Sequence, residues 1–129
     1  MASNKAIIRG TYEASPEQKG ARLKAALAPD ASWTEAAGFP YAGTYVGFEA
    51  IAAGVFTRLA TEWIDYRAEA RTYLEDGDQV AAFGVYSGTY RATGKAMTAT
   101  FAHLYTLKDG KIVRMEQVVD SAMVTPTLT

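Results

Sequence analysis

The chain has no cysteine and a single histidine, His103, among its 129 residues. The absence of cysteine excludes disulfide bonds, thiolate nucleophiles and thiolate metal sites. Zinc sites usually combine several histidine or cysteine ligands, so one histidine does not favour such a site. We therefore expect no metal in this protein.

Concentrated charge and long apolar runs are also missing. The formal net charge is −1 and the basic residues are scattered, whereas nucleic-acid-binding proteins usually show a concentrated basic patch. No apolar stretch approaches the ~18 residues that a membrane span requires. The first ten residues lack the apolar segment and cleavage site of a signal peptide. We expect a cytoplasmic protein that binds neither nucleic acid nor membrane.

The content that is present favours one globular domain over residues 1–129. Apolar residues make up 49% of the chain, which is too many for a disordered protein, and the length is typical of a single domain. Ser3 or Asn4 can cap a first helix. The run Ser15-Pro16-Glu17-Gln18 is a good start for a second helix, which we expect to run to about Leu27 and to end at Ala28-Pro29-Asp30.

The rest of the chain indicates a strand, a helix and an antiparallel meander. We predict a strand over 31–37, a loop over 38–43, and further strands over 63–74, 80–90, 97–107 and 112–119. Between them, apolar residues follow the spacing of a buried helical stripe, at Phe48, Ile51, Ala52, Val55, Phe56 and Leu59. The predicted fold is α+β: a curved antiparallel sheet wrapped on N-terminal helices, forming a cone-shaped barrel with an internal pocket.

A turn at Asp109–Gly110 fixes a predicted register between the last two strands. Asp-Gly between apolar runs is a strong hairpin signal. A two-residue loop pairs Lys108 with Lys111, Leu107 with Ile112, Tyr105 with Arg114, and His103 with Glu116. Because side chains alternate along a strand, one face is then expected to carry Phe101, His103, Tyr105, Arg114, Glu116, Val118 and Asp120. This mixture of aromatic and ionisable groups suits the wall of a pocket.

Three segments and one further residue carry a resemblance that covers nearly the whole chain. They are residues 27–35, 41–47 and 101–112, with Asp120 after them. On these segments the chain resembles the SnoaL-like polyketide cyclase and ketosteroid-isomerase-like group of the nuclear-transport-factor-2-like superfamily. The resemblance implies a cone-shaped α+β barrel and a homodimer joined through the outer face of the sheet.

The resemblance also suggests roles for four residues. Glu35 corresponds to the carboxylate that moves the proton in the isomerases. His103 stands where those enzymes have an aspartate as oxyanion donor, and Tyr12 is the rough equivalent of a second donor on the first helix. Asp120 matches the acid/base aspartate of the cyclases. Two divisions of labour remain open: Glu35 as the base with His103 as donor, or Asp120 as acid/base with His103 orienting the substrate.

Both divisions serve the same chemistry. Removal of a proton next to a carbonyl group creates an enolate, which requires a base near the carbon and donors near the oxygen. A carboxylate in a partly apolar pocket has a raised pKa and is a better base near neutral pH. We expect a cofactor-independent isomerase or cyclase of a small apolar carbonyl compound. The expected substrate-binding residues are Trp33, Tyr41, Tyr45, Phe56, Trp63, Phe101 and Glu116.

Other interpretations of the same residues remain open. His103 can simply pair with Glu116, and a carboxylate there would favour the charged imidazole. Asp120 can serve as the N-cap of a C-terminal helical turn. The fold also accommodates non-catalytic ligand binding or a dimerisation role, because fold does not fix function. The same carboxylates suit hydrolysis of an epoxide as a variant of the enzyme hypothesis.

Overall fold

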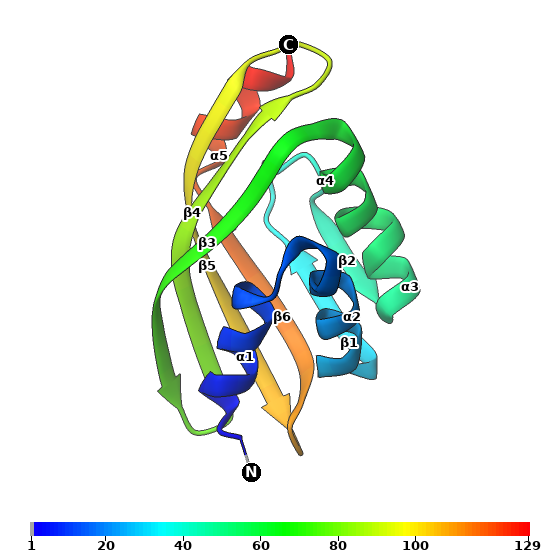
Figure 1. Ribbon diagram of the computed structural model, residues 1–129, viewed down its shortest axis with the longest axis vertical. Helices are drawn as coiled ribbons and strands as arrows, with labels where there is room; N and C mark the ends of the chain where they lie inside the picture. The colour runs from blue at the N-terminus through cyan, green and yellow to red at the C-terminus, as the bar shows by residue number, and fades with distance from the viewer. Residues whose placement is uncertain (1) are drawn as a thin grey trace.

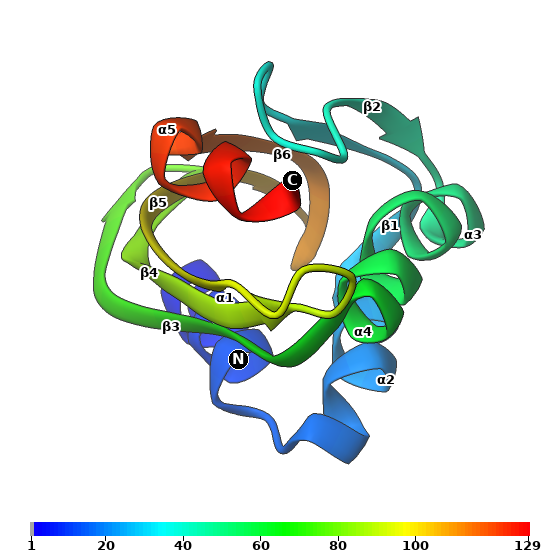
Figure 2. The ribbon, with the colours of Figure 1, turned by 90° about the horizontal axis from the view of Figure 1, so that it is seen from above.

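The computed structural model describes residues 2–129, which form a strongly curved sheet with helices on its concave side (Figure 1). Within these residues the sheet has six strands in the order β2-β1-β6-β5-β4-β3. Viewed from above, the sheet curls around the interior without closing into a complete barrel (Figure 2). The strands are β1 (Leu27–Glu35), β2 (Gly43–Val46), β3 (Trp63–Asp76), β4 (Gln79–Tyr90), β5 (Ala96–Lys108) and β6 (Lys111–Val119).

The two predicted N-terminal helices are present as α1 (Asn4–Glu13) and α2 (Pro16–Ala26). The Ser3 hydroxyl caps α1 by accepting a hydrogen bond of 3.0 Å from the Ala6 amide, and Ser15 precedes α2 as its N-cap residue. Strand β1 begins directly after α2, four residues earlier than predicted. Pro29 therefore lies within β1 and is not part of a separate loop.

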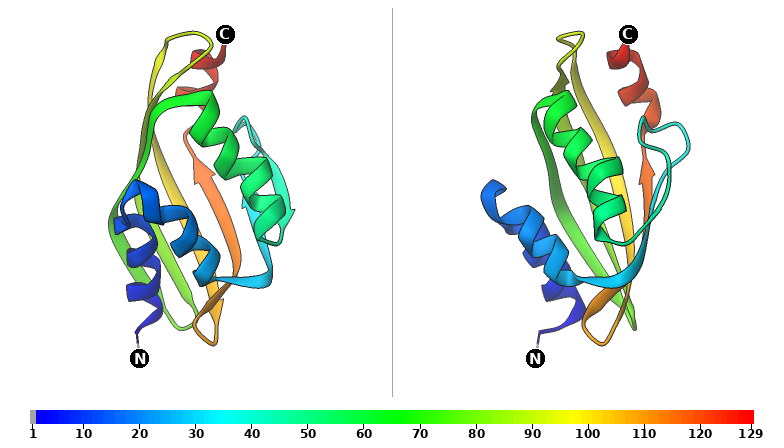
Figure 3. Two further views of the ribbon diagram at one scale, coloured as in Figure 1. Left: turned by 45° about the vertical axis from the view of Figure 1, so that its right-hand side comes forward. Right: turned by 90° about the vertical axis from the view of Figure 1, so that its right-hand side faces the viewer.

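A second helical segment crosses the concave face of the sheet (Figure 3). It comprises α3 (Phe48–Ile51), a π-helical turn η1 (Ala52–Phe56) and α4 (Thr57–Glu62). The predicted buried stripe is confirmed at its centre, where Ile51 and Val55 are 0% and 1% exposed. A side chain at Gly54 would collide with the Tyr45 ring, since a Cβ there would lie 2.2 Å from it. Glycine at this position allows β2 to pack closely against the helix.

The sheet is mixed, which corrects the prediction of an antiparallel sheet. β1 runs parallel to β6 and antiparallel to β2, while β3 to β6 form the predicted antiparallel meander. β2 was not predicted: the expected loop over 38–43 includes its first residue, Gly43, because the glycine- and proline-containing segment there is typical of turns, and residues 44–46 were assigned to no element. Pairing with β1 nonetheless makes 43–46 an edge strand. None of the described helices has the length and apolar character needed to cross a membrane.

The Asp109–Gly110 turn is confirmed, but the register it was expected to impose holds for only two pairs. Both turn residues have positive φ, 52° and 77°, as the tight hairpin turn requires. Lys108 pairs with Lys111 and Leu107 with Ile112 as predicted. A bulge then leaves Val113 without a directly opposed residue, so Thr106 pairs with Arg114. Such an extra residue shifts every later pair on the strand by one position.

The bulge reverses the two faces of β6 while leaving β5 as predicted. The predicted pairs Tyr105–Arg114 and His103–Glu116 are wrong: Tyr105 pairs with Met115 and His103 with Gln117. Met115 and Gln117 are buried, whereas Arg114 and Glu116 form an ion pair of 2.9 Å on the outer side. The imidazole of His103 still points into the fold, because the slip affects its partner strand and not its own.

The C-terminal segment lies across the end of the cone at which β1 and β6 finish (Figure 2). It consists of α5 (Ser121–Val124) and a 3-10 turn η2 (Thr125–Leu128). Val124, the last residue of α5, is fully buried. Thr93, in the turn between β4 and β5, donates a hydrogen bond of 2.6 Å to the Thr127 carbonyl. This end of the cone is therefore covered in the structure.

Candidate functional site

The interior of the cone contains a buried polar cluster built from five elements. Glu35 comes from the end of β1, Tyr86 from β4, and Gln117 from β6. His103 and Tyr105 come from β5, and Tyr12 enters from α1. Of these, Glu35, Tyr86, His103, Tyr105 and Gln117 are between 2% and 6% exposed, and Tyr12 is half-buried. The alternation of buried and exposed residues along β5 and β6 places these side chains on the concave face.

Hydrogen bonds connect most of the cluster into one chain. The Gln117 amide nitrogen donates to the Tyr86 hydroxyl at 2.9 Å, and that hydroxyl contacts Nε2 of His103. Nδ1 of His103 contacts the Tyr12 hydroxyl. The Tyr12 hydroxyl lies 2.7 Å from that of Tyr105. The imidazole is thus bonded at both nitrogens and sits at the centre of the chain.

The groups of this chain are neutral at physiological pH. Burial lowers the pKa of His103 from 6.5 to about 3, which contradicts the expected stabilisation of its charged form by Glu116. Burial also raises the pKa values of Tyr12, Tyr86 and Tyr105 above their usual range. Removal from water disfavours the charged form of each group. The chain can therefore donate and accept hydrogen bonds without carrying a charge.

Glu35 lies beside this chain without being part of it. Among the described residues, none forms a hydrogen bond with its carboxyl group, and burial raises its pKa from 4.5 to about 8. After the effect of burial, its negative charge further raises the pKa values of Tyr66, Tyr86 and Tyr105. Coulombic influence of this kind requires proximity. The carboxyl group thus faces the same interior as the hydroxyl groups.

Trp33 precedes Glu35 by two residues on the same face of β1. Its indole nitrogen is buried, and no described residue accepts its hydrogen bond. Its ring packs edge-on against Phe56 and Tyr105, with centroids 5.2 Å and 6.1 Å away. A buried donor without an acceptor is costly and rare in folded proteins. The Trp33 indole and the Glu35 carboxyl group are therefore two buried polar groups on one face of β1 that have no side-chain hydrogen bond to any described residue.

Aromatic rings pack in a row through the interior. Phe101 stacks on His103 with centroids 4.3 Å apart and on Tyr86 at 4.4 Å, and Tyr12 lies parallel to Phe101 at 6.2 Å.

Two hollows lie on the surface, with volumes of about 240 Å³ and 270 Å³. The first is lined by Thr61 and four other residues, and the second by Ala6 and seven other residues. Neither Glu35 nor His103 lines either hollow. Because Glu35 is only 5% exposed, a ligand that reaches it must displace some of the interior aromatic side chains.

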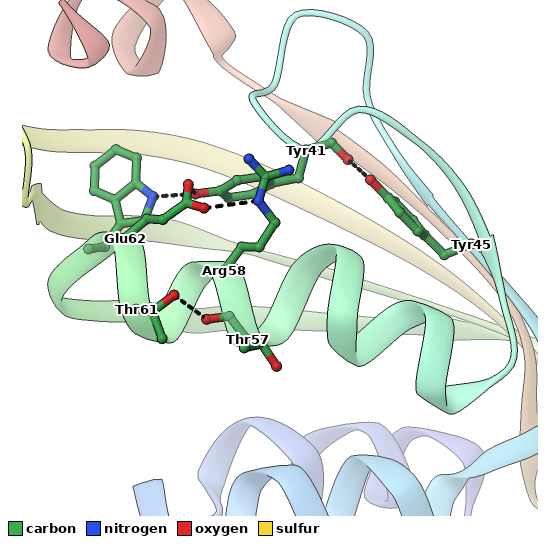
Figure 4. A network of polar contacts seen from close by, with 7 residues as sticks. Tyr41, Tyr45, Thr57, Arg58, Thr61 and Glu62 are labelled. Carbon is green, nitrogen blue, oxygen red and sulfur yellow. Dashed lines mark hydrogen bonds and ion pairs between the residues drawn. The ribbon is translucent and has the colours of Figure 1, made fainter.

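Three of the predicted lining aromatics belong to a separate network near the covered end of the cone (Figure 4). Tyr41 donates a hydrogen bond of 2.7 Å to Glu62 and accepts one of 3.1 Å from the Trp63 indole. Arg58 lies over the Tyr41 ring and pairs with Glu62 at 3.0 Å. Tyr45 donates to the Tyr41 carbonyl at 2.9 Å. These contacts connect the loop between β1 and β2 to α4. The Trp63 indole nitrogen, the one polar atom of that side chain, donates to Tyr41 and is therefore not free to bind a ligand.

The structure does not bring Asp120 or Glu116 to the polar cluster. Asp120 is exposed and occupies the N-cap position of α5, although its side chain makes no capping hydrogen bond. Its backbone amide instead donates to the Thr100 carbonyl at 3.0 Å. Glu116 faces outward because of the bulge in β6. The structure thus gathers Glu35, His103 and Tyr12, with Trp33, Phe56 and Phe101 around them.

Sequence reasoning missed Gln117 and Tyr86 as members of the site. Gln117 was assigned to the outer face by the predicted register, and only the bulge turns it inward. Tyr86 pairs with Ala99 on β5 and shares a buried face with Ala82. Alternation of inward and outward side chains along β4 could have predicted that Tyr86 points inward. Nothing in the sequence, however, indicated that Tyr86 would contact His103. In the described residues, no group of three histidine, aspartate or glutamate side chains is arranged to hold a metal ion.

Comparison with known proteins agrees with this architecture. The model of the SnoaL-like domain matches residues 8–115. The chain belongs to the SnoaL-like domain family. This confirms the family resemblance noted from the sequence, along with the cone-shaped α+β fold. No curated protein matches the sequence significantly.

Solved structures of SnoaL-like and related proteins superpose over almost the whole chain. An NTF2-like protein from Burkholderia thailandensis E264 is 40% identical, with a TM-score of 0.95 over 100% of this chain and 99% of its own. TerC, crystallised with polyporic acid, is 27% identical, with a TM-score of 0.81 over 97% of each chain. A putative SnoaL-like polyketide cyclase from Jannaschia sp. CCS1 is 16% identical, with a TM-score of 0.80 over 96% of this chain and 90% of its own. The last of these shows similarity of fold alone.

Proposed function

We propose that this SnoaL-like protein is a cofactor-independent enzyme that removes and returns a proton next to the carbonyl group of a small, largely apolar compound. The observation that carries the proposal is the Glu35 carboxyl group, which is buried, lacks a hydrogen bond among the described residues, and has a pKa of about 8. General bases work best when their pKa lies near the working pH. Burial thus supplies the base strength that an ordinary glutamate lacks.

The reaction uses groups that the interior already holds. The C–H bond next to the carbonyl breaks, its proton passes to the Glu35 carboxylate, and the electron pair moves to the carbonyl oxygen. A neutral donor of the neighbouring chain, in which Tyr105 lies beside Trp33, then stabilises the enolate oxygen. Return of the proton to a different carbon of a conjugated enolate gives isomerisation. Attack of the enolate carbon on a second carbonyl gives cyclisation, and the proton held by Glu35 then passes to the alkoxide that forms there. The crystal of TerC with polyporic acid supports small-molecule binding in this fold.

Proton abstraction can be tested before the natural substrate is known. Neutral aryl ketones such as 2-tetralone are incubated with the protein in D₂O, and loss of the signal of the protons next to the carbonyl is followed by NMR. We expect the protein to accelerate exchange, with a rate that rises towards pH 8 as Glu35 ionises. Glu35→Gln should lower the rate by at least ~100-fold, the usual contribution of a general base.

Glu49→Gln is the matched control, since Glu49 is exposed on α3 and distant in sequence from the cluster. It should leave the exchange rate unchanged. Equal rates for the unmodified protein and Glu35→Gln across a panel of such ketones would contradict proton abstraction by Glu35.

A non-catalytic role is the second candidate, and the closed interior favours it. His103 and Tyr105 are 6% and 2% exposed, as expected of a core that serves only for stability or dimerisation. Binding without chemistry would change the tryptophan fluorescence of the protein when a ketone is added, but would give no deuterium exchange. The same experiment therefore separates the two functions.

We further propose that two copies associate through the outer face of the sheet, as the family resemblance implies. An apolar row crosses three strands there: Phe83 pairs with Ala102, which pairs with Val118. Phe83 and Val118 are 43% and 67% exposed. The helices lie on the opposite, concave face (Figure 3), so no helix within residues 2–129 covers this row. Large exposed apolar patches often mark interfaces between proteins.

Phe83→Glu should convert the dimer to a monomer, because it places a charge within the apolar row, at the position of its largest side chain. Light scattering coupled to size exclusion should show the mass fall from twice 13.9 kDa to 13.9 kDa. Met123→Glu alters a residue of similar exposure, 53%, in the C-terminal segment, and should leave the mass unchanged. A monomeric mass for the unmodified protein would overturn the proposed dimer.

A further inference from the structure

Gln117 determines which way its neighbours donate their hydrogen bonds. The side chain is buried, and its amide oxygen accepts a hydrogen bond of 2.9 Å from the Ala36 backbone amide. A backbone N–H can only donate, so the atom facing Ala36 must be the oxygen. The other terminal atom is then the NH₂ group, which donates to the Tyr86 hydroxyl at 2.9 Å.

This donation leaves the Tyr86 proton free to go to the imidazole. The Tyr86 oxygen accepts from Gln117, and its hydroxyl contacts both Nε2 of His103 and the side chain of Tyr66. An imidazole nitrogen is a stronger acceptor than a phenol oxygen, so the Tyr86 proton goes to Nε2. A neutral imidazole carries one proton, so an accepting Nε2 requires a protonated Nδ1. Nδ1 contacts Tyr12, whose hydroxyl in turn contacts that of Tyr105. Each group then donates to the next, from Gln117 to Tyr105.

We propose that Gln117 is a positioning residue that orients the whole chain, so that the Tyr105 hydroxyl proton remains at its end as a free donor beside Trp33 and Glu35. Gln117 also fixes the backbone at Ala36, the residue that follows Glu35, and so couples the donor chain to the strand that carries the base. The role of Tyr105 towards a substrate oxygen depends on the proposed function. The orientation of the chain does not.

The unmodified protein tests the orientation directly. His103 is the only histidine, so a long-range ¹H–¹⁵N spectrum of the labelled protein reports its two ring nitrogens without ambiguity. We expect the proton on Nδ1 at pH 7. A proton on Nε2, or an averaged mixture of the two tautomers, would overturn the proposal.

Gln117→Glu should reverse the chain. Above the pKa of the new carboxyl group, both of its oxygens accept, one from the Ala36 amide and one from the Tyr86 hydroxyl. The Tyr86 oxygen must then accept from the imidazole, which moves the His103 proton to Nε2. Gln79→Glu makes the same substitution at an exposed position on β4 and should leave the proton on Nδ1.

Gln117→Leu provides a second variant in case the first does not fold. It removes the donor without adding an acceptor, and we expect a mixture of the two tautomers. Retention of the Nδ1 proton alone in folded Gln117→Leu, or in folded Gln117→Glu above the pKa of its new carboxyl group, would show that another group sets the orientation and would overturn the proposal.

The consequence for catalysis has its own measurement. Tyr105→Phe removes the free donor but leaves the bonds between Gln117, Tyr86 and His103 in place. It should slow the deuterium exchange of aryl ketones by about 100-fold, the usual effect of losing one oxyanion donor, while His103 keeps its tautomer. Exchange at the unmodified rate would overturn the role of Tyr105. Absence of exchange in every form of the protein, with the expected tautomer, would contradict the proposed function and leave the role of Gln117 intact.

Discussion

Glu35→Gln is expected to make the protein more stable in alkaline solution. The folded state holds the Glu35 proton up to a pH of about 8, whereas the unfolded chain releases it near 4.5. The folded state therefore binds more protons over this interval, and the free energy of unfolding falls as the pH rises through it. The loss in the unmodified protein amounts to about 3–5 kcal/mol above pH 8. Glutamine cannot ionise and avoids this loss.

Urea unfolding of both proteins between pH 4 and pH 9 measures the effect. The two free energies of unfolding should be similar near pH 4, where glutamine resembles the protonated carboxyl group, and should diverge as the pH rises. Glu49→Gln, on the exposed side of α3, should track the unmodified protein within about 0.5 kcal/mol. Parallel curves for Glu35→Gln would mean that Glu35 ionises as easily in the folded as in the unfolded protein.

The same substitution should therefore stabilise the fold and abolish proton abstraction. This opposition is typical of residues kept for function at the expense of stability. The opposition also bears on the two candidate functions. In a core that serves only for stability, an ionisable group without a hydrogen-bond partner does not stabilise the fold. The Trp33 indole, buried without an acceptor among the described residues, is a second group of this kind on the same strand.

The sequence predicted the inward groups of β1 and β5 correctly because simple alternation holds along both strands. Trp33 and Glu35 share a buried face, as do Phe101, His103 and Tyr105. The Asp109–Gly110 turn was equally predictable, since it needs two residues with positive φ. These local rules suffice wherever a strand is regular.

The same rules fail at β6 because of the bulge at Val113. Nothing local distinguishes this valine from an ordinary strand residue, and bulges arise from the curvature that the whole sheet must adopt. The bulge exchanges the predicted inward residue Glu116 for Gln117. The resulting site has a neutral histidine within a chain of hydroxyl and amide groups, whereas the sequence predicted an ion pair. The electrostatics of the interior thus depend on one extra residue in a hairpin.

Asp120 illustrates a different limit. Its position at the end of the last strand was predicted correctly, but the direction of its side chain depends on how the chain leaves the sheet. The chain turns at once into α5, and Asp120 takes the N-cap position on the exposed side. Of the two divisions of labour that the sequence left open, our proposal keeps the one in which Glu35 is the base, because Asp120 lies outside the polar cluster.

His103→Gln is expected to remove the acid sensitivity that the histidine confers. The unfolded chain takes up the imidazole proton near pH 6.5, while the folded protein resists it down to about pH 3. The unfolded state binds more protons over this interval, so the free energy of unfolding of the unmodified protein falls as the pH drops from about 6.5 to about 3. The loss amounts to about 3–5 kcal/mol. Glutamine cannot be protonated in this range, although it retains a donor and an acceptor.

Glu35 and His103 together predict the shape of the stability curve. Between about pH 4.5 and 6.5 their effects on the free energy of unfolding oppose each other. From about pH 3 to 4.5 only His103 changes this free energy, and from about pH 6.5 to 8 only Glu35 does. Subtracting the curve of His103→Gln from that of the unmodified protein isolates the histidine: the difference should shrink steadily from pH 6.5 towards pH 3. At neutral pH the variant should be less stable, because it loses the stacking on Phe101. A difference that stays constant with pH would show that the imidazole protonates within the fold, and that the chain from Gln117 to Tyr105 does not hold it neutral.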